Sequence, residues 1–295
     1  MRKPLVLALL AASAVTGCGS SSPSAAPGVV RVVAAENFWG SIASQIGGAH
    51  ARVTSIIHDP TADPHLYESS AQDANAVANA QLVIENGLGY DDFMDQLLSA
   101  SSSHSRPVLT VADVLHVSGQ DADPHLWYDV PRAHDVAAAI AAQLTTLDPE
   151  DKAVFASNLA SFDASMKLPL AVVHTIKQKY ANAPVVYTER LPAYLVAACG
   201  LSDKTPPGYA RAIEDGNEPS PADTQAMQQV LTGSARARVL LYNVQATSPA
   251  TQQMRDLAAR SGVRVVSVSE TMPAGQTYAS WQTMQAEQIL RALGS

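Results

Sequence analysis

The chain has 295 residues, of which 47% are hydrophobic and 16% are charged, and its formal net charge at pH 7 is −8. The hydrophobic fraction is large enough for a packed core, which excludes a disordered or collagen-like protein. An acidic surface repels phosphate backbones, so we expect no nucleic-acid partner.

The N-terminus has the features of a bacterial export signal. Arg2 and Lys3 precede an apolar run over residues 4–15, which is too short for a permanent membrane helix. Residues 15–18, Val-Thr-Gly-Cys, resemble the lipobox, in which the cysteine is lipidated and becomes the first mature residue. We therefore expect a lipoprotein signal peptide over residues 1–17 and lipidation of Cys18, with ordinary cleavage that leaves a free thiol as the alternative.

Residues 18–28 are rich in serine and proline and indicate a flexible tether. Beyond them, short β-rich runs alternate with helical stretches, which is the pattern of an α/β fold with parallel sheets. We predict a first α/β lobe over residues 29–147. Its strands are expected at 29–35, 53–57, 82–85 and 108–112, and its helices at 39–46, 71–80, 91–100 and 131–147.

A long linking helix is predicted over residues 148–180. Asp148 at the N-cap, Pro149 at the first helical position and acids in the first turn favour a helix start. Pro169 lies inside this pattern and should kink or end the helix. A second lobe over residues 181–295 is expected to contain strands at 185–188, 239–242 and 263–268, and helices at 191–198, 221–231, 249–260 and 278–293.

The predicted fold class is therefore α/β, with two lobes joined by one long helix. Each lobe is expected to be a mostly parallel β-sheet flanked by helices.

One pentapeptide, Ala-Asp-Pro-His-Leu, occurs at residues 62–66 and again at 122–126. Each copy places a histidine, His65 or His125, behind a proline that stiffens the loop. Asp63 and Asp123 can accept N–H bonds from the backbone or the imidazole and so fix the ring tautomer. Two imidazoles on paired rigid loops suit a transition metal, but two similar turns with solvent-facing histidines would show the same repeat.

Several further motifs make the chain similar to the cluster A-I substrate-binding proteins of zinc and manganese ABC transporters. They are the two Asp-Pro-His loops, the glycine turn at 86–89, Glu-Pro-Ser-Pro at 218–221, Thr-Tyr at 277–278 and the lipobox. In that family, one divalent metal is held by two loop histidines, a residue that ends the first strand of the second lobe, and an acid near the C-terminus. The resemblance implies the metal ligands His65, His125, Glu189 and Glu270, with Asp63 and Asp123 supporting the histidines.

The two glutamates follow predicted strands directly, where ligands of open α/β sheets gather. The alternative for Glu189 is a surface acid paired with Arg190. Glu270 departs from the family, which usually has aspartate at this position, and its longer side chain shifts the carboxylate or allows it to bind bidentately.

The resemblance implies a monomeric protein, lipid-anchored to the outer face of the bacterial cytoplasmic membrane, that delivers a divalent metal to an ABC permease. Two imidazoles and two carboxylates are a hard ligand set, which favours Mn²⁺ as cargo and Zn²⁺ next. Four protein ligands leave no open position for water activation, so no enzyme activity is expected. Two alternatives remain, a surface adhesin and a metal-dependent enzyme with an open coordination position. The enzyme alternative gains weight if Glu270 lies apart from the other ligands.

Overall fold

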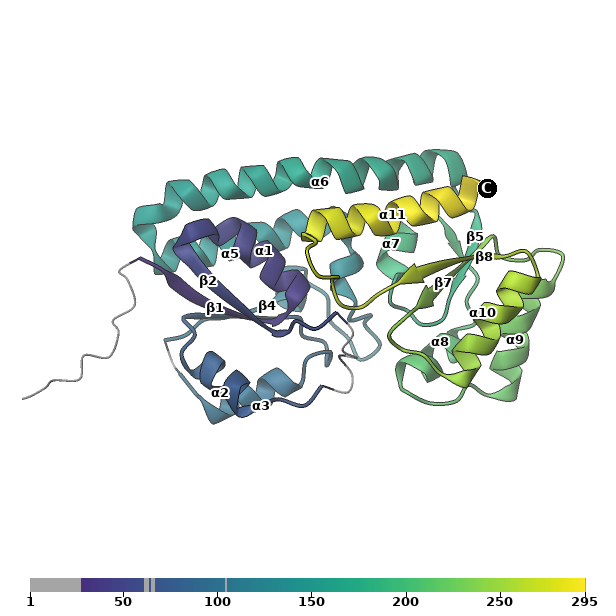
Figure 1. The fold of residues 1–295 in the computed structure, drawn as a ribbon, viewed down its shortest axis with the longest axis horizontal. Coiled ribbons are helices and arrows are strands. Elements are labelled where there is room, and N and C mark those ends of the chain that lie inside the picture. Colours follow the sequence, from purple (N-terminus) through teal and green to yellow (C-terminus); the bar gives the residue numbers. More distant parts are fainter. Residues whose placement is uncertain (1–27, 61–63, 65–66, 104, 295) are drawn as a thin grey trace, which may run out of the picture.

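The structure is a computed structural model that describes residues 28–60, 64, 67–103 and 105–294 (Figure 1). The predicted signal peptide and most of the predicted tether, with Cys18, lie outside the described residues, as do Asp63 and His65 of the first histidine loop. Within the described part of the chain, no helix combines the length and the apolar character that crossing a membrane requires.

The N-terminal lobe is built on a four-stranded, fully parallel sheet with the strand order β2-β1-β3-β4. Its strands are β1 (Val30–Glu36), β2 (Ala51–Ile57), β3 (Leu82–Glu85) and β4 (Val108–Thr110). Helices α1 (Asn37–Gly47) and α5 (Ala133–Leu147) cover one face, and α2 (Ala71–Ala78) and α3 (Phe93–Ala100) cover the other (Figure 1).

Both faces of this sheet are buried because successive side chains of a strand point to opposite sides. Along β1, Val32 and Ala34 belong to the hydrophobic core that includes α1 and α5. Val33 and Ala35 instead pack with side chains of α2 and α3. The continuous apolar run in this strand is therefore the expected pattern of a sheet with helices on both faces.

The C-terminal lobe repeats the topology, with a parallel sheet in the order β6-β5-β7-β8. Its strands are β5 (Pro184–Tyr187), β6 (Ser202–Asp203), β7 (Val239–Asn243) and β8 (Arg264–Val268). One face packs against α7 (Ala193–Ala198) and α11 (Tyr278–Gly294). The other packs against α8 (Pro207–Glu214), α9 (Pro221–Thr232) and α10 (Pro249–Arg260).

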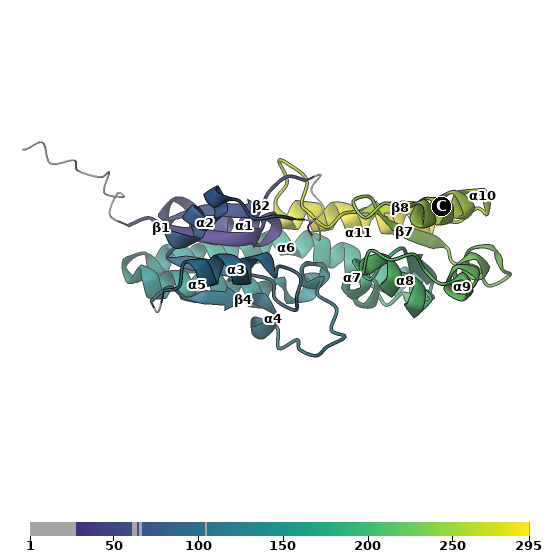
Figure 2. The ribbon, with the colours of Figure 1, turned by 90° about the horizontal axis from the view of Figure 1, so that it is seen from below.

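Helix α6 (Lys152–Tyr180) runs along both lobes, with α11 packed beside it (Figures 1 and 2). One hydrophobic cluster continues from the first lobe into the second along these two helices. The predicted fold class, two α/β lobes with parallel sheets joined by one long helix, is thus confirmed.

Three local expectations differ from the structure. Of the two outcomes expected at Pro169, a kink or an end of the helix, the end is wrong. Helix α6 continues to Tyr180, because buried side chains on both sides of that proline, such as Met166 and Val172, keep it packed against the core. The strand expected at 108–112 stops at Thr110, and the next four residues form the short helix α4 (Val111–Val114). The two-residue strand β6 was not predicted because it is too short to show an alternation. Helix α8 was not predicted because it starts at Pro-Pro-Gly, residues 206–208, a sequence typical of a loop.

Candidate metal centre

Three of the four predicted metal ligands lie in the described part of the chain, and all three are buried. The exposed fraction is 0% for His125, 1% for Glu189 and 0% for Glu270. Glu189 and Glu270 each follow the last residue of a strand, β5 or β8, by two positions. His125 lies on the long connection between β4 and α5. Buried charged groups of this kind require specific partners.

A single amide joins the two glutamates. Asn243, the last residue of β7, donates through Nδ2 to Glu189 Oε1 and to Glu270 Oε1, the second bond being 2.7 Å long. Asn243 Oδ1 accepts a bond of 2.9 Å from the Gln245 backbone N–H, which fixes the orientation of the amide. Because β5, β7 and β8 are neighbours in the sheet, their carboxyl ends bring these three side chains to one place.

Sequence reasoning did not select Asn243. The available signal was its position directly after the predicted strand at 239–242, the same position that singled out the two glutamates.

Glu270 is also bound from the other lobe. The hydroxyl of Tyr90 donates to Glu270 Oε2 over 3.0 Å, although the two residues are 180 positions apart. Burial, followed by the charges of Glu270 and Glu36, raises the pKa of Tyr90 well above its ordinary value. The phenol therefore stays protonated and remains a hydrogen-bond donor. This contact shows that the carboxyl edges of the two sheets face each other.

His125 is oriented by the aspartate of its own loop. Asp123 Oδ1 lies 2.7 Å from His125 Nδ1 and also accepts a 3.1 Å bond from the His125 backbone N–H. This contact assigns the ring proton to Nδ1 and leaves the lone pair on Nε2. His125 Nε2 is buried and has no hydrogen-bond partner among the described residues. An imidazole prepared in this way is suited to bind a metal through Nε2.

The environment of His125 also changes its pKa. Burial alone lowers the pKa, but the hydrogen bond to Asp123 and the charges of Asp123 and Glu270 outweigh burial, so the pKa lies above its ordinary value. The rings of Tyr90 and Trp127 stand edge-on to the imidazole, with centroids 5.9 Å and 5.3 Å away. Water is thereby kept from this side of the ring.

The glycine turn at residues 86–89 holds the second histidine loop. Asn86 Nδ2 donates to the carbonyl of Pro124 over 2.8 Å, next to His125. Asp91 in turn accepts bonds from the backbone N–H groups of Asn86 and Gly87, at 2.5 Å and 2.9 Å. Gly87 has φ +82°, and a Cβ at this position would lie 2.7 Å from a side-chain atom of Thr110. Only glycine fits there without strain.

The alternative reading of Glu189 as a surface acid paired with Arg190 does not fit this geometry. Glu189 is buried, and Arg190 instead forms two hydrogen bonds of 2.7 Å and 2.6 Å with Glu214. Glu270 lies beside Glu189 rather than apart from it, since both contact the Asn243 amide.

In the described part of the chain, the predicted ligands His125, Glu189 and Glu270 do not form the tightest group of metal-ligating side chains. Among the described residues, one group of three ligating side chains has donor atoms that all lie within 4.8 Å of one another, and it consists of His50, Asp148 and Asp151. His125 faces the glutamates from the opposite lobe. Tyr90 contacts both sides, because its ring stands edge-on to His125 and its hydroxyl donates to Glu270.

An acidic cleft of about 550 Å³ leads from the surface of the C-terminal lobe to Glu189. Its lining includes the carboxylates of Glu214, Asp215 and Glu218. Glu214 is paired with Arg190, and Asp215 lies 3.6 Å from Arg211, so arginines offset part of the negative charge of this cleft.

Comparison with known proteins gives one family. The sequence model described as "ZnuA: Zinc-uptake complex component A periplasmic" matches residues 32–292. The manganese-binding lipoprotein MntA of Bacillus subtilis (strain 168) is 29% identical over 176 residues, 57% of each chain. The manganese ABC transporter substrate-binding lipoprotein ScaA of Streptococcus gordonii is 27% identical over 247 residues, 77% of each chain. This chain thus spans a little over half of MntA and about three quarters of ScaA.

Two solved structures show the same fold. The periplasmic zinc-binding protein TroA of Treponema pallidum superposes with a TM-score of 0.73 at 24% identity, over 90% of this chain and 99% of TroA. The protein FpvC of Pseudomonas aeruginosa in complex with Mn²⁺ also has a TM-score of 0.73, at 20% identity, over 90% of this chain and 98% of FpvC. Since the family model matches nearly all of the described chain, the protein belongs to the family of ZnuA, the periplasmic component A of the zinc-uptake complex.

Proposed function

We propose that this protein is an extracytoplasmic solute-binding protein that captures a divalent transition metal, Mn²⁺ or Zn²⁺, and delivers it to an ABC permease. The observation that carries the proposal is the convergence of two buried carboxylates, Glu189 and Glu270, on one shared amide, that of Asn243. A divalent cation is the partner that best offsets two adjacent carboxylates in a buried place.

The proposed ligands are His65, His125, Glu189 and Glu270, with Asp63 and Asp123 orienting the histidines. The Asp123 contact supports this role for the second loop, because it leaves His125 Nε2 ready to bind. The first loop has the same sequence, and the same role is proposed for Asp63 and His65. The metal would draw His125 and the glutamates together across the two lobes. It is bound as cargo, and no catalytic step is proposed.

Mn²⁺ is the favoured cargo and Zn²⁺ the next. Carboxylate oxygens suit manganese, and the matching relatives MntA and ScaA are named for manganese. The affinity order of divalent ions nevertheless places zinc above manganese, so the purified protein should bind Zn²⁺ at least as tightly. Growth of a deletion strain under separate manganese and zinc limitation tests the cargo, and rescue by zinc alone would overturn the choice of manganese.

We also propose how the protein is anchored to the membrane and where its tether, lobes and linking helix begin and end. A lipidated Cys18 would hold a monomer on the outer face of the cytoplasmic membrane, and the relatives are named as lipoproteins. The tether is placed at residues 18–28, the lobes at 29–147 and 181–295, and the linking helix at 148–180. The ends of α5 at Leu147 and of α6 at Tyr180 support these boundaries.

Titration of the mature chain with Zn²⁺ and Mn²⁺ tests the proposed site. The Glu189→Ala variant should bind both ions at least about 100-fold more weakly, because it loses one ligand and leaves Asn243 without that acceptor. The Glu218→Gln variant, which changes an acid of the same cleft, should keep the affinity of the unchanged protein. Equal affinity in Glu189→Ala and the unchanged protein would remove Glu189 from the ligand set.

A further inference from the structure

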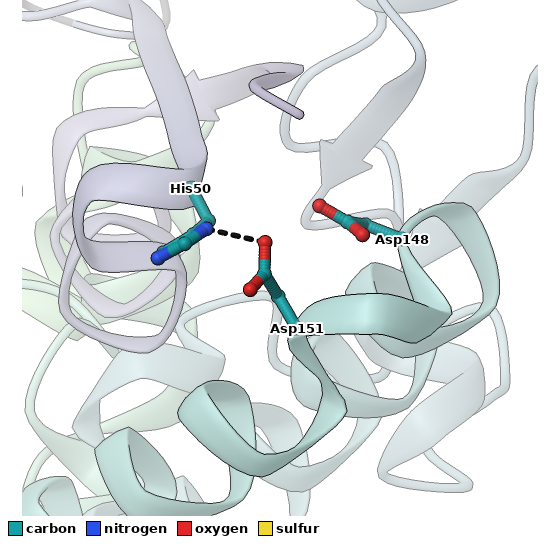
Figure 3. Close-up of side chains that lie close together, drawn as sticks. All are labelled: His50, Asp148 and Asp151. Carbon is teal, nitrogen blue, oxygen red and sulfur yellow. Dashed lines mark ion pairs between the residues drawn. The ribbon is translucent and has the colours of Figure 1, made fainter. Parts of the chain in front are cut away.

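A second group of metal-ligating side chains lies in the N-terminal lobe (Figure 3). His50 ends a 3₁₀ turn between α1 and β2, and Asp148 and Asp151 flank the turn that leads from α5 into α6. His50 stands at the amino end of β2, whereas the candidate metal centre lies at the carboxyl edges of the sheets. The length of β2, roughly 23 Å, separates the two ends.

The three side chains are already close together. His50 Nδ1 forms an ion pair with Asp151 Oδ2, and one donor atom from each residue lies within 4.8 Å of the other two. Figure 3 shows the Asp151 carboxylate between the imidazole and Asp148. Ligands around a zinc ion lie about 3.3 Å apart, so small side-chain rotations would close the group around an ion.

Neither aspartate performs the function that its position suggests. Asp148 is the N-cap of the 3₁₀ turn and Asp151 the N-cap of α6, yet neither side chain makes a capping hydrogen bond. Asp148 Oδ2 is buried and has no hydrogen-bond partner among the described residues. A buried carboxylate oxygen without a donor is costly, and a cation would satisfy it.

The charge and accessibility of the group also suit a cation. Among the described residues, neither Asp148 nor Asp151 forms an ion pair with a lysine or arginine. The side chains of His50 and Asp151 are 34% and 25% exposed, so an ion can enter from solvent and water can complete its coordination. The N-terminus of α6 carries a partial positive charge that offsets part of the negative charge of the aspartates. This should lower the affinity of the group for a cation.

We infer that His50, Asp148 and Asp151 form a second binding site for a divalent transition metal of borderline softness, such as Zn²⁺. One imidazole nitrogen and two carboxylate oxygens are the ligand types that these ions take in proteins. The ion takes the place of the proton on His50 Nδ1, and the neutral ring then carries its proton on Nε2. Because the ligands come from the α1–β2 connection and from the start of α6, the bound ion ties the first lobe to the linking helix.

Equilibrium dialysis of the mature chain against Zn²⁺ tests this inference, which does not rest on the proposed function. The unchanged protein should bind two ions per chain, the second at least about ten-fold more weakly, since it has three ligands and more exposure. His50→Ala and Asp148→Asn should each bind one ion. His134→Ala is the control and should bind as many ions as the unchanged protein. His134 Nδ1 lies 2.7 Å from Asp163 Oδ1 in an exposed pair, and among the described residues this pair belongs to no group of three ligating side chains.

Thermal unfolding of a second set of variants separates this site from the candidate metal centre. In Glu189→Ala, Zn²⁺ should still raise the Tm, and adding Asp148→Asn should abolish that rise. Binding that His50→Ala and Asp148→Asn both leave equal to that of the unchanged protein would overturn the inference and leave the group as an ion pair at a helix start. One ion per unchanged chain that both variants lose would instead support this site and overturn the proposed centre. Asp148→Asn keeps the shape of the side chain, so a loss of folding in His50→Ala would still leave a decisive variant.

Discussion

At the scale of single residues, the candidate metal centre depends on neutral groups as much as on charged ones. Asn243 donates to both glutamates, and Tyr90 donates to the far oxygen of Glu270. These donors fix the carboxylates before any ion arrives, so less conformational freedom is lost when the ion binds.

The role of Asn243 can be measured directly. Asn243→Ala should lower the affinity for Mn²⁺ and Zn²⁺ by about 10- to 100-fold without changing the stoichiometry of the tighter site, because the glutamates lose their common donor. Calorimetric titration gives both quantities. Asn217→Ala is the control, since Asn217 lines the same cleft and its backbone N–H donates to the carbonyl of Ala212, and it should leave the affinity unchanged. An unaltered affinity in Asn243→Ala would contradict the positioning role.

The histidine makes the affinity depend on pH. Because the pKa of His125 is raised, the metal-free protein takes up a proton on this ring already above about pH 6.5, and that proton must leave when the metal binds. The apparent affinity should therefore fall as the pH decreases from 7.5 to 5, by up to about ten-fold per pH unit for each proton displaced. Asp123→Asn removes the contact that raises the pKa and should move the fall to lower pH. Competition titration with a chelator measures the profile, and a flat profile would argue against histidine ligation.

At the scale of elements, two buried acids, Glu36 and Asp91, lie at the carboxyl edge of the first sheet. Glu36 ends β1, and Asp91 follows the glycine turn after β3. Burial, then the charge of Asp91, raises the pKa of Glu36 well above its ordinary value. Burial also raises the pKa of Asp91, to about 7.

These shifts predict how stability depends on pH. Between roughly pH 4 and 7 the folded chain binds more protons than the unfolded chain, so the free energy of unfolding falls as the pH rises. Glu36→Gln should remove part of this slope and stabilise the metal-free protein at pH 7.5, where the buried carboxyl of the unchanged protein is under pressure to ionise. Urea unfolding at several pH values tests it, with the exposed Glu68→Gln as the control. A slope equal to that of the unchanged protein would mean that Glu36 is ionised in the folded chain.

At the scale of the whole molecule, the lobes are joined in a way that resists a wide opening. Helix α6 is continuous over 29 residues, and the hydrophobic cluster along α6 and α11 includes side chains of both lobes. Asn37 of the first lobe also exchanges two hydrogen bonds with the backbone of Met272, at 2.8 Å and 3.0 Å. Bending such a helix would break backbone hydrogen bonds, and separating the lobes would expose the shared core.

Metal binding should therefore rearrange loops rather than swing the lobes. Solution scattering of the metal-free and metal-loaded protein should give radii of gyration that differ by less than about 1 Å, because a hinge through α6 is too costly. A larger decrease on metal binding would show that α6 bends or that its contacts with α11 open.

Much of the local structure was predictable from the sequence. The helix expected at 221–231 forms as α9, with Ser220 accepting the backbone N–H of Asp223, since capping and periodicity act over a few neighbouring residues. Positions at strand ends also indicated where Glu189 and Glu270 would lie, because parallel strands direct their carboxyl ends to one edge. The ligand set that includes His65 and His125 stays a prediction.

Other features depend on contacts between distant segments, which only the packing of the lobes determines. Tyr90 reaches Glu270 from the opposite lobe, and Asn243 joins two glutamates from different loops. Pro169 remains helical because the core on both sides of it outweighs its missing hydrogen bond. The sequence by itself therefore determined the elements and the edge at which ligands gather, because these follow from local propensity and strand direction. The tertiary structure decided which side chains meet there, because that depends on packing between residues far apart in the chain.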